Sequence, residues 1–533
     1  MKTKAFLTGL LLAATATTAQ AGGILTNTNQ SIDFLRNPAR DAAIGLDGVY
    51  SNPAGVAFLP DGFHLGINWQ YAHQTRTITT TSPYLGLGFK NNNQNTKVYE
   101  GVADAPFIPS LQAAWNKNNW SLQFNFSVTG GGGACEYADG LGSFESKVGL
   151  IASKFMTIDG FANSLNQFSS LYPMMGMATP EALPTYGVSG YDMDGYMQGR
   201  QYYFGFQLGS AYKVNDNLSV YGGLRILYGT ATYKAKISNI MVNTEGGLVS
   251  FASFLPNVPA QATAVAGRAQ EVLSLINAAQ AAGAQLPQQV TAAVPQLQAG
   301  LASLQDPESQ KQLADLSKYS QGVNLLCNQW SVGVAPVVGI DYKYGNFNFA
   351  AKYEFETEIH MKNESTVNSA NEIDAVKKFR DGEEVREDQP ALLAVGAQWS
   401  PLSMIRLNAG WHHYFDKSAQ WFENAQEKLS HDTNEFLLGA EWDVNPRVTI
   451  SLGGQLTRYG LTDEYMNDMS FVVNSYSIGF GGNFKVNDKV ILKGGFFQTN
   501  YENYDRKDYP ETGSSDIFTR TNYVLGLGCE ITL

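Results

Sequence analysis

The alternation of apolar with small or polar side chains, in segments of about ten residues between Gly62 and Leu533, constrains the fold more than any other feature. Over 120–129, for example, Trp, Leu, Phe, Phe and Val alternate with Ser, Gln, Asn, Ser and Thr. Side chains on a strand point to opposite faces with a period of two, so each segment has one apolar and one polar face. A tilted strand needs about 9–11 residues to cross a bilayer core. The pattern therefore predicts an all-β protein, a transmembrane antiparallel β-barrel.

The number and the connections of these segments set the topology. The segments number about fourteen, an even number as in single-chain bacterial barrels. Short connections rich in Asn, Asp, Gly and Pro alternate with long ones, and such barrels have tight turns on the periplasmic side. Both mature termini are therefore expected in the periplasm. The expected strands are roughly 62–75, 105–115, 120–129, 200–213, 217–233, 330–343, 346–359, 390–400, 404–415, 432–443, 447–459, 471–485, 488–501 and 518–533.

The composition agrees with a barrel and argues against other classes. Charged residues make up only 16% of the chain, while 53 Gly, 27 Tyr and 29 Phe are present, as expected for a polar interior and aromatic girdles. The net charge of −12 argues against nucleic acid as a partner. No readable grouping of side chains indicates an enzyme, a cofactor or a metal site, so none of these is expected.

Residues 1–21 have the features of a cleaved secretory signal peptide. Lys2 and Lys4 precede an apolar stretch, and Ala19-Gln20-Ala21 is an A-x-A cleavage site. The apolar stretch is too short for a membrane helix. Export and a multi-pass location in the bacterial outer membrane are expected.

Residues 22–61 do not follow the strand pattern. They contain two Asn-Pro-Ala triplets, at 37–39 and 52–54, among small residues. A disordered leader is usually more polar than this segment. We therefore expect a hatch that plugs the lumen, followed by the barrel at 62–533.

Two long inserts, 134–199 and 240–329, are expected on the extracellular side. Within the second, 257–320 is rich in Ala, Gln and Leu and predicts a helical hairpin, with an amphipathic helix around 272–279 and shorter helices near 287–304 and 307–320. Both a spacer and a partner-binding role are compatible with it. The first insert carries an adaptable apolar cluster, which either binds ligand or packs against the barrel rim: Leu171, Tyr172, Met174 and Met175.

Three cysteines allow one disulfide. Cys135 and Cys327 lie in or beside the long inserts and could pair in an exported protein. The odd count argues against a disulfide framework. Both states stay open at this point.

The chain resembles the FadL/TodX family of outer-membrane transporters of hydrophobic compounds. The residues that carry the resemblance are 47–55 (DGVYSNPAG), 209–219 (GSAYKVNDNLS), 394–401 (AVGAQWSP) and 405–407 (IRL), and it covers nearly the whole mature chain apart from the inserts. The last residue, Leu533, is not the aromatic residue that usually ends the family, and the insert 257–320 is larger than the family core needs. The hatch motif implied by the resemblance consists of Asn52, Pro53, Ala54 and Gly55.

The resemblance implies passive uptake. Long-chain fatty acids or aromatic hydrocarbons would be captured by extracellular loops, pass into the hatch-plugged barrel and leave sideways at a kink in the third strand. Four glycines follow Val128-Thr129 and weaken a strand ladder, so Gly130 and Gly131 are the kink candidates, with a flexible strand end as the alternative. The implied partners are a hydrophobic small molecule, outer-membrane lipid and the barrel assembly machinery, with a monomeric protein.

Parity also selects candidate ligand contacts. If Leu224 and Ile226 face lipid, Arg225 faces the lumen, and Arg406 does so by the same argument. Each either binds a carboxylate of the ligand or belongs to a salt-bridge network in the lumen. Pro336 cannot donate a ladder hydrogen bond and marks either a bulge or a second opening.

Two other functions remain compatible with a barrel. A general porin for small polar solutes would need an open lumen, which a hatch would block. A surface adhesin or binding protein would use the 257–320 hairpin, with the barrel as its anchor.

Overall fold

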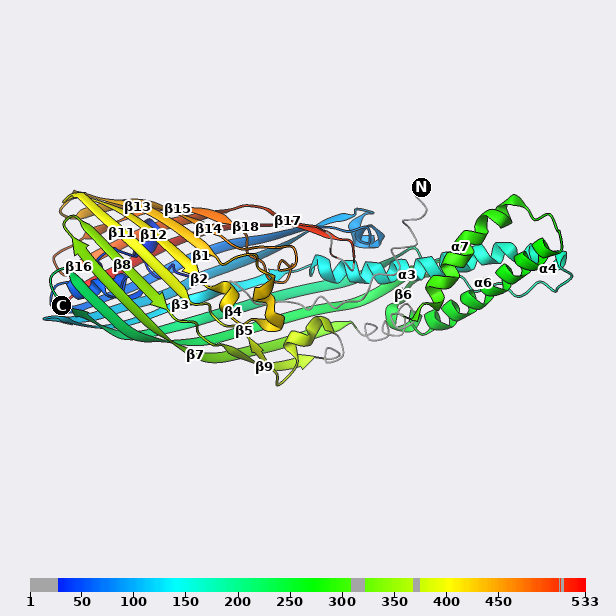
Figure 1. The fold of residues 1–533 in the computed structure, drawn as a ribbon, viewed down its shortest axis with the longest axis horizontal. Coiled ribbons are helices and arrows are strands. Elements are labelled where there is room, and N and C mark those ends of the chain that lie inside the picture. The colour runs from blue at the N-terminus through cyan, green and yellow to red at the C-terminus, as the bar shows by residue number, and fades with distance from the viewer. Residues whose placement is uncertain (1–26, 308–321, 368–373, 508, 510–511) are drawn as a thin grey trace.

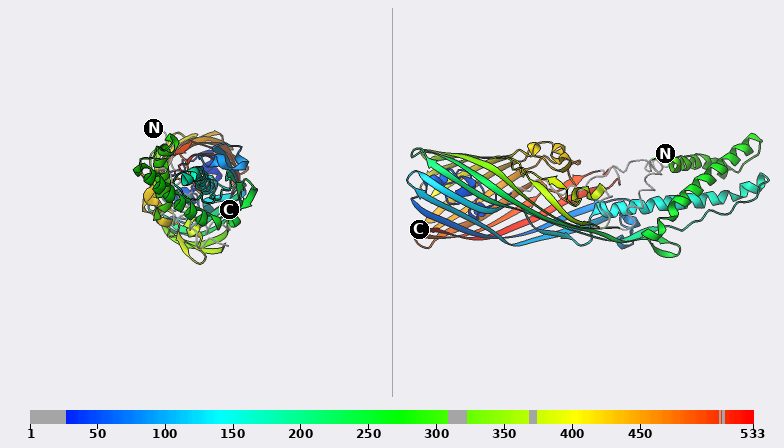
Figure 2. Two further views of the ribbon diagram at one scale, coloured as in Figure 1. Left: turned by 90° about the vertical axis from the view of Figure 1, so that its right-hand side faces the viewer. Right: turned by 90° about the horizontal axis from the view of Figure 1, so that it is seen from below.

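The computed structural model describes residues 27–307, 322–367, 374–507, 509 and 512–533, and these form an elongated molecule (Figure 1). A β-barrel occupies one end, with the C-terminus on its rim, and a group of helices extends from the opposite rim (Figures 1 and 2). The expected signal peptide, 1–21, and the expected helix near 307–320 lie outside the described residues, except for residue 307.

The barrel is closed and antiparallel with fourteen wall strands, which confirms the predicted fold class. Its last strand pairs with its first from His64↔Thr532 to Thr81↔Ser515. The wall strands are β1 (Gly62–Thr81), β2 (Thr96–Lys117), β3 (Trp120–Tyr137), β4 (Gly190–Lys213), β5 (Leu218–Thr244), β7 (Val323–Tyr344), β8 (Phe347–Glu354), β11 (Leu392–Leu402), β12 (Ile405–Tyr414), β13 (Asn434–Asn445), β14 (Val448–Arg458), β15 (Ser475–Lys485), β16 (Val490–Tyr501) and β18 (Ser515–Thr532). Short strands extend the rim: β6 (Gly247–Ser250), β9 (His360–Val367), β10 (Glu384–Arg386) and β17 (Tyr504–Arg506).

Several strands are longer than the alternation predicts. β4 begins at Gly190 and β5 ends at Thr244, so the inserts between wall strands span 138–189 and 245–322 rather than 134–199 and 240–329. On β5 the outward positions change from Leu224 and Ile226 to Lys234 and Lys236. The alternation of apolar with polar residues therefore ends at the edge of the apolar outer surface, whereas the backbone pairing of the strand continues beyond it. β8 is shorter than expected because the chain leaves the wall after Glu354.

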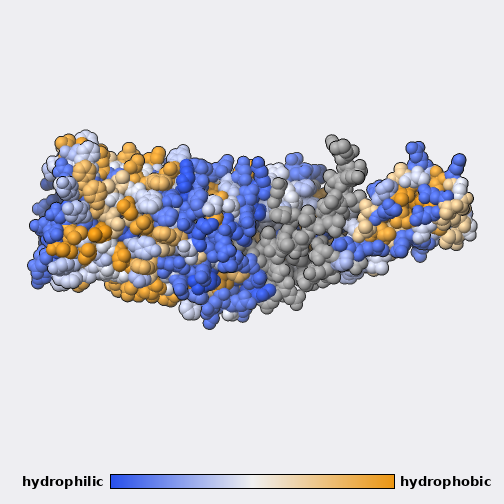
Figure 3. Space-filling model, in the orientation of Figure 1, coloured by the Kyte–Doolittle hydropathy of each residue, from blue (hydrophilic) through white to orange (hydrophobic). Residues whose placement is uncertain are grey.

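Exposed apolar side chains occur on wall strands around the barrel, and on the face that Figure 3 shows they form a belt on the part away from the helices. Outward side chains such as Leu438, Leu452 and Leu527 are 67%, 58% and 61% exposed, which is unusual for leucine in a water-soluble surface but expected against lipid. Within the described residues, no helix is long and apolar enough to cross a membrane.

The helices beyond the rim form a tower (Figures 1 and 2). The expected hairpin consists of α6 (Asn257–Ala281) and α7 (Gln288–Gln305), and it packs against α3 (Gly142–Asn166), which the sequence analysis did not predict. Buried residues of α3 recur with helical spacing, at 148, 151, 152, 155, 158 and 162, so the signal was present in the sequence. Shorter helices complete this region and the loops: α4 (Leu171–Met174), α5 (Phe251–Phe254), η3 (Leu85–Leu87), η4 (Phe89–Asn91), η5 (Gln167–Ser170), η8 (Asp374–Phe379), η9 (Asp416–Ser418) and η10 (Phe422–Lys428).

The disulfide between Cys135 and Cys327 does not form, and both cysteines are free. The strand registers align Cys135 with Gly199, Gly199 with Tyr233, and Tyr233 with Cys327, so two strands separate the cysteines. Three strand spacings amount to roughly 14 Å, twice the Cα separation that a disulfide tolerates. Of the two states that the sequence left open, the structure has the free cysteines, because the extended strands place both residues in the wall.

Residues 27–61 fold inside the barrel as the hatch, with α1 (Ile32–Arg36), α2 (Gly48–Ser51) and η2 (Gly55–Phe58). The Ser31 hydroxyl caps α1 by accepting a hydrogen bond from the Phe34 amide. The hatch rests on glycines of the wall. A Cβ at Gly396 would lie 2.6 Å from the Asp41 Cβ, and one at Gly479 would overlap the Leu35 carbonyl. Glycine at these positions lets backbone approach backbone, which accounts for part of the high glycine content.

Gly479→Ala is expected to displace the hatch without unfolding the barrel, because the added methyl group collides with hatch backbone. Overpacking of this kind costs about 1–3 kcal/mol. Planar-bilayer conductance should rise. Gly222→Ala is the matched control, since nothing lies within 4 Å of a Cβ built there. Equal conductance in both variants would contradict this account of the hatch.

Candidate functional site

The hatch motif docks on the lumenal wall. The Asn52 side-chain Nδ2 donates a hydrogen bond to the Asp341 carboxylate at 2.5 Å. The side-chain Oδ1 of Asn52 accepts one from the Gly55 backbone amide at 3.2 Å. The Pro53 and Ala54 carbonyls also accept hydrogen bonds from the wall. The Asn52 side chain thus stabilises a turn in which the backbone carbonyls of Pro53 and Ala54 point toward the wall. The wall residues that hold the motif come from β3, β5 and β7: Gln123, Ser219 and Asp341.

Buried ion pairs hold the other half of the hatch. Arg36 and Arg40 both contact the Glu441 carboxylate on β13 at 2.9 Å. Lys493 on β16 contacts Asp33 of the hatch at 2.6 Å. All five side chains are less than 10% exposed. Removing one partner of a buried pair costs about 3–5 kcal/mol, because the other charge stays buried and unpaired. These pairs therefore fix the hatch against its wall.

Both predicted ligand arginines lie in salt bridges. Arg225 pairs with Glu354 and lies 5.1 Å from the centre of the Tyr50 ring. Arg406 makes two hydrogen bonds of 2.7 Å to the Asp443 carboxylate. The salt-bridge alternative therefore describes their positions in this structure.

The predicted apolar cluster of the first insert lies in the tower. Leu171 and Tyr172 are buried in the helical core, and Met175 packs against that core. Met174 is 60% exposed. None of the four lines the cavity described next. Leu141 and Phe144 pack into the cluster at the barrel mouth, whereas the segment from Val148 to Val188 packs onto α6 and α7, and this division could not be inferred from composition.

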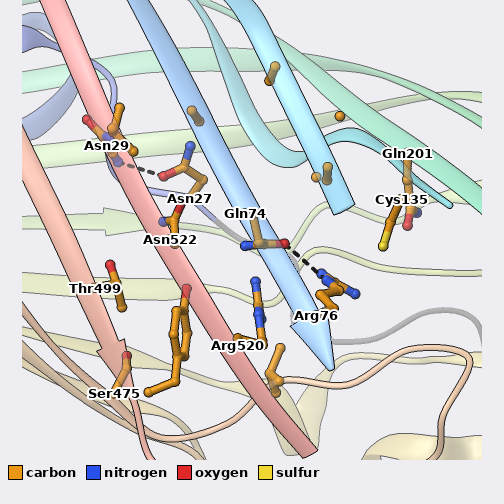
Figure 4. A pocket seen from close by; sticks show the side chains of 18 of the residues that line it. Asn27, Asn29, Gln74, Arg76, Cys135, Gln201, Ser475, Thr499, Arg520 and Asn522 are labelled. Atoms are coloured by element: carbon orange, nitrogen blue, oxygen red, sulfur yellow. Dashed lines mark hydrogen bonds between the residues drawn. The ribbon is translucent and has the colours of Figure 1, made fainter. Parts of the chain in front are cut away.

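A cavity of about 320 Å³ lies above the hatch (Figure 4). Asn27, Thr28, Asn29 and Phe34 of the hatch contribute to its lining. The wall contributes polar side chains, several of which are labelled in Figure 4, and apolar ones, in similar proportion. The apolar lining residues include Ala103, Ala105, Ile108, Met469, Val472, Phe497 and Val524. Ile67 and Trp69 on β1 face outward, so the even-numbered residues of β1 face the lumen. This alternation was the sequence signal that could have placed the even-numbered residues of β1 in the cavity lining.

The wall is broken beside this cavity, between β2 and β3. Their pairing runs from Lys117↔Trp120 to Leu111↔Phe126 and resumes only at Val102↔Glu136. Gly131 at φ +73° and Gly133 at φ +65° adopt a backbone that favours glycine, and β3 shifts its register against β4 at this point. The kink candidates Gly130 and Gly131 therefore lie at an interruption of the wall. Ala103, Ala105, Ile108, Gly131, Gly133 and Cys135 line the cavity from the two sides of the break.

The open edges of this break are partly satisfied. Pro106 and Pro109 lie in the unpaired part of β2, where proline has no N–H to leave without an acceptor. On β3, the Thr129 carbonyl accepts a hydrogen bond from the Asn27 amide at 2.9 Å, and the Gln30 side chain donates to the Val128 carbonyl at 3.0 Å. The start of the hatch thus covers part of the strand edge that β2 leaves open.

Pro336 marks the end of another pairing. The ladder between β5 and β7 continues through Leu224↔Pro336 without a register shift, so no bulge forms on that side. Pairing of β7 with β8 ends at Val337↔Glu354, and pairing with β9 starts at Trp330↔Lys362. The chain after Glu354 lies against this gap, because a Cβ at Gly333 would meet Thr357 and Ile359.

Loops at the rim on the side of the tower close the barrel mouth with an apolar cluster that includes Phe379, Trp421 and Phe471. Two carboxyl groups lie at this closure. Burial raises the pKa of Asp416, whose carboxylate accepts the Thr433 amide, to about 7. Desolvation, and then the neighbouring Asp388, raise the pKa of Glu356 to about 7.

Comparison with solved structures identifies the fold. No family model and no curated protein matches the sequence. A crystal structure of a Pseudomonas aeruginosa FadL homologue matches 96% of this chain and 99% of that chain at a TM-score of 0.56 and 11% identity. The deltaS2S3 mutant of the TodX monoaromatic hydrocarbon channel matches 95% and 99% at 0.53 and 11% identity, and the P. putida toluene transporter TodX matches 92% and 94% at 0.50 and 11% identity. The chain therefore has the FadL/TodX fold, as the resemblance predicted.

The closure of the barrel mouth should loosen as the pH rises from about 4 to 7. Asp416 and Glu356 bind a proton more tightly in the folded protein than in the unfolded chain, so the folded state loses stability between the unfolded pKa near 4 and the folded pKa of about 7. The protection factors of the amides in 355–359 and 415–433, which correct for the intrinsic rise of exchange with pH, should therefore fall over this range. Asp416→Asn, which stays neutral, should remove the fall in 415–433, and an unchanged pH profile of protection in that variant would contradict the assignment.

Proposed function

We propose that this protein is an outer-membrane channel for the passive entry of hydrophobic small molecules, such as long-chain fatty acids or aromatic hydrocarbons. The observation that carries the proposal is a half-apolar cavity above the hatch that reaches an interruption of the barrel wall. The solved structures with the same fold are described as a FadL homologue, a toluene transporter and a monoaromatic hydrocarbon channel. The proposed location, reached by a cleaved signal peptide, is the bacterial outer membrane.

The path runs from the extracellular loops into the cavity and then sideways into the bilayer between β2 and β3. A hydrophobic molecule gains nothing by entering the periplasm, whereas lipid beyond the break solvates it. The rim of the break offers apolar side chains outward, since Phe107 is 67% exposed and Val102 is 39% exposed. No covalent chemistry and no cofactor are needed for this movement. The protein acts as a monomer, with the ligand, membrane lipid and the barrel assembly machinery as partners.

The hatch disfavours a general porin. It fills the lumen with buried side chains, and ion pairs join it to the wall at Glu441 and Lys493. A polar solute would have to break these pairs to pass, while a lateral path avoids them. An adhesin anchored by the barrel would bind its partner through the tower, which lies apart from the cavity. Such a function would not require a cavity in the barrel.

Gly131→Ala tests the lateral path. An alanine at φ +73° costs about 1–3 kcal/mol, and its Cβ would overlap the Gln201 carbonyl, so the β3 backbone must move at the break. Transfer of radiolabelled toluene and dodecanoate into liposomes that contain the purified full chain should become at least fivefold slower, which corresponds to an activation free energy about 1 kcal/mol higher.

Gly345→Ala is the matched control, because Gly345 has a φ of +58° but no atom within 4 Å of its Cβ. Its transfer rate should match the unmodified protein. Equal rates in all three folded proteins would refute the lateral path. A rate in the unmodified protein no higher than in protein-free liposomes would refute the transport proposal itself.

A further inference from the structure

Two arginines face each other in the cavity. Arg76 on β1 and Arg520 on β18 are directly paired in the register of these strands. Both line the cavity, and Figure 4 shows them close together, with Gln74 and Asn522 nearby. Side chains directly opposite on an antiparallel pair have Cβ atoms about 5 Å apart, and like charges in this position repel.

Neither arginine forms an ion pair with a carboxylate among the described residues, unlike Arg36, Arg40 and Arg225 of the lumen. The Arg76 Nε donates a hydrogen bond to Gln74 at 3.0 Å. The Nε of Arg520 is buried without an acceptor. Two cationic groups in a cavity are therefore left short of acceptors.

Aromatic rings hold the two guanidinium groups in place. Arg76 lies 5.6 Å from the centre of the Phe471 ring, and Arg520 lies 4.8 Å from the centre of the Tyr501 ring. Both positions are therefore defined before any ligand binds, and less side-chain entropy is lost on binding. Phe471 comes from the closure of the barrel mouth and Tyr501 from the wall, so the arginines lie below that closure.

The carboxylate of the cavity is already engaged. Glu435 also lines the cavity, but its oxygens contact His412 at 2.9 Å and Gln455 at 2.6 Å. It is therefore held by its own neighbours, and no ion pair joins it to Arg76 or Arg520 within the described ranges. An anion bound between the arginines would relieve their repulsion and accept a hydrogen bond from the Arg520 Nε.

We propose that Arg76 and Arg520 bind the carboxylate of an amphipathic ligand, an inference that rests on the transport function proposed above. A carboxylate can accept paired N–H groups from guanidinium in a bidentate geometry. Arg76 is paired with Gly101 of β2, next to the point where pairing between β2 and β3 stops. The apolar tail then lies along Ala103, Ala105 and Ile108 toward the break. The preferred substrates are thus apolar molecules with a carboxylate rather than neutral hydrocarbons.

The test compares dodecanoate with dodecanol at pH 8, using the full-length protein in detergent and correcting for partition into protein-free micelles. The unmodified protein should bind dodecanoate at least tenfold more tightly. The double variant Arg76→Gln and Arg520→Gln should bind dodecanoate about as weakly as dodecanol, with dodecanol affinity unchanged. Arg520→Lys, which keeps the charge, should retain part of the preference. Arg447→Gln, in an exposed turn, should retain all of it.

Thermal unfolding provides a second measurement that does not depend on transport. Dodecanoate should raise the Tm of the unmodified protein and not that of the double variant, whose own Tm without ligand should not fall, since a repulsion has been removed. Acetate should not displace dodecanoate at equal concentration. Competition by acetate as strong as by dodecanoate would overturn the assignment in favour of a general anion site.

Different results would overturn the arginine site and the transport function. Equal binding of dodecanoate and dodecanol by the unmodified protein, or a preference that survives in the folded double variant, would overturn the arginine site and leave transport of hydrophobic molecules standing. Binding of neither compound, together with no transfer of toluene into liposomes, would overturn the transport proposal as well.

Discussion

The structure depends on one requirement: backbone N–H and C=O groups that face lipid must be paired within the wall, because hydrocarbon offers them no partner. Closure of β18 on β1 meets this requirement around the barrel. The interruption between β2 and β3 is therefore costly, and it occurs where Pro106, Pro109 and the Gly130–Gly133 run reduce or redirect the unpaired groups. The prolines and glycines at this point therefore lower the cost of the interrupted pairing.

A similar requirement holds for charged groups in the lumen: a buried charge needs an opposite charge nearby. The hatch carries Asp33, Arg36 and Arg40 into a space that excludes most water, and each meets an opposite charge on the wall or on the hatch itself. Arg76 and Arg520 differ from these hatch residues, since no carboxylate of the described residues forms an ion pair with either of them. The same low-dielectric space that makes ion pairs strong makes an unmatched pair of cations expensive, which is why a ligand anion is the natural partner.

Much of the fold could be predicted because the barrel imposes a strict period of two. The fourteen strands, their tight turns and the inward position of Arg225 all follow from parity. The rim was predicted less well, since alternation fades once the outer face leaves lipid, and β4 and β5 continue beyond it. The alternation also predicts whether a side chain points inward or outward, but it does not predict which residue that side chain contacts. Parity left Arg225 and Arg406 open as ligand contacts or as members of a salt-bridge network for this reason, and only the structure shows that Glu354 and Asp443 pair with them.

The sequence by itself determined the class of fold, the inward and outward faces and the presence of a hatch, because each follows from local periodicity and composition. Only the tertiary structure decided which charges are neutralised, where the wall opens and where the inserts pack. These depend on residues far apart in the chain, as with Arg76 and Arg520, which are brought side by side only when the last strand closes on the first.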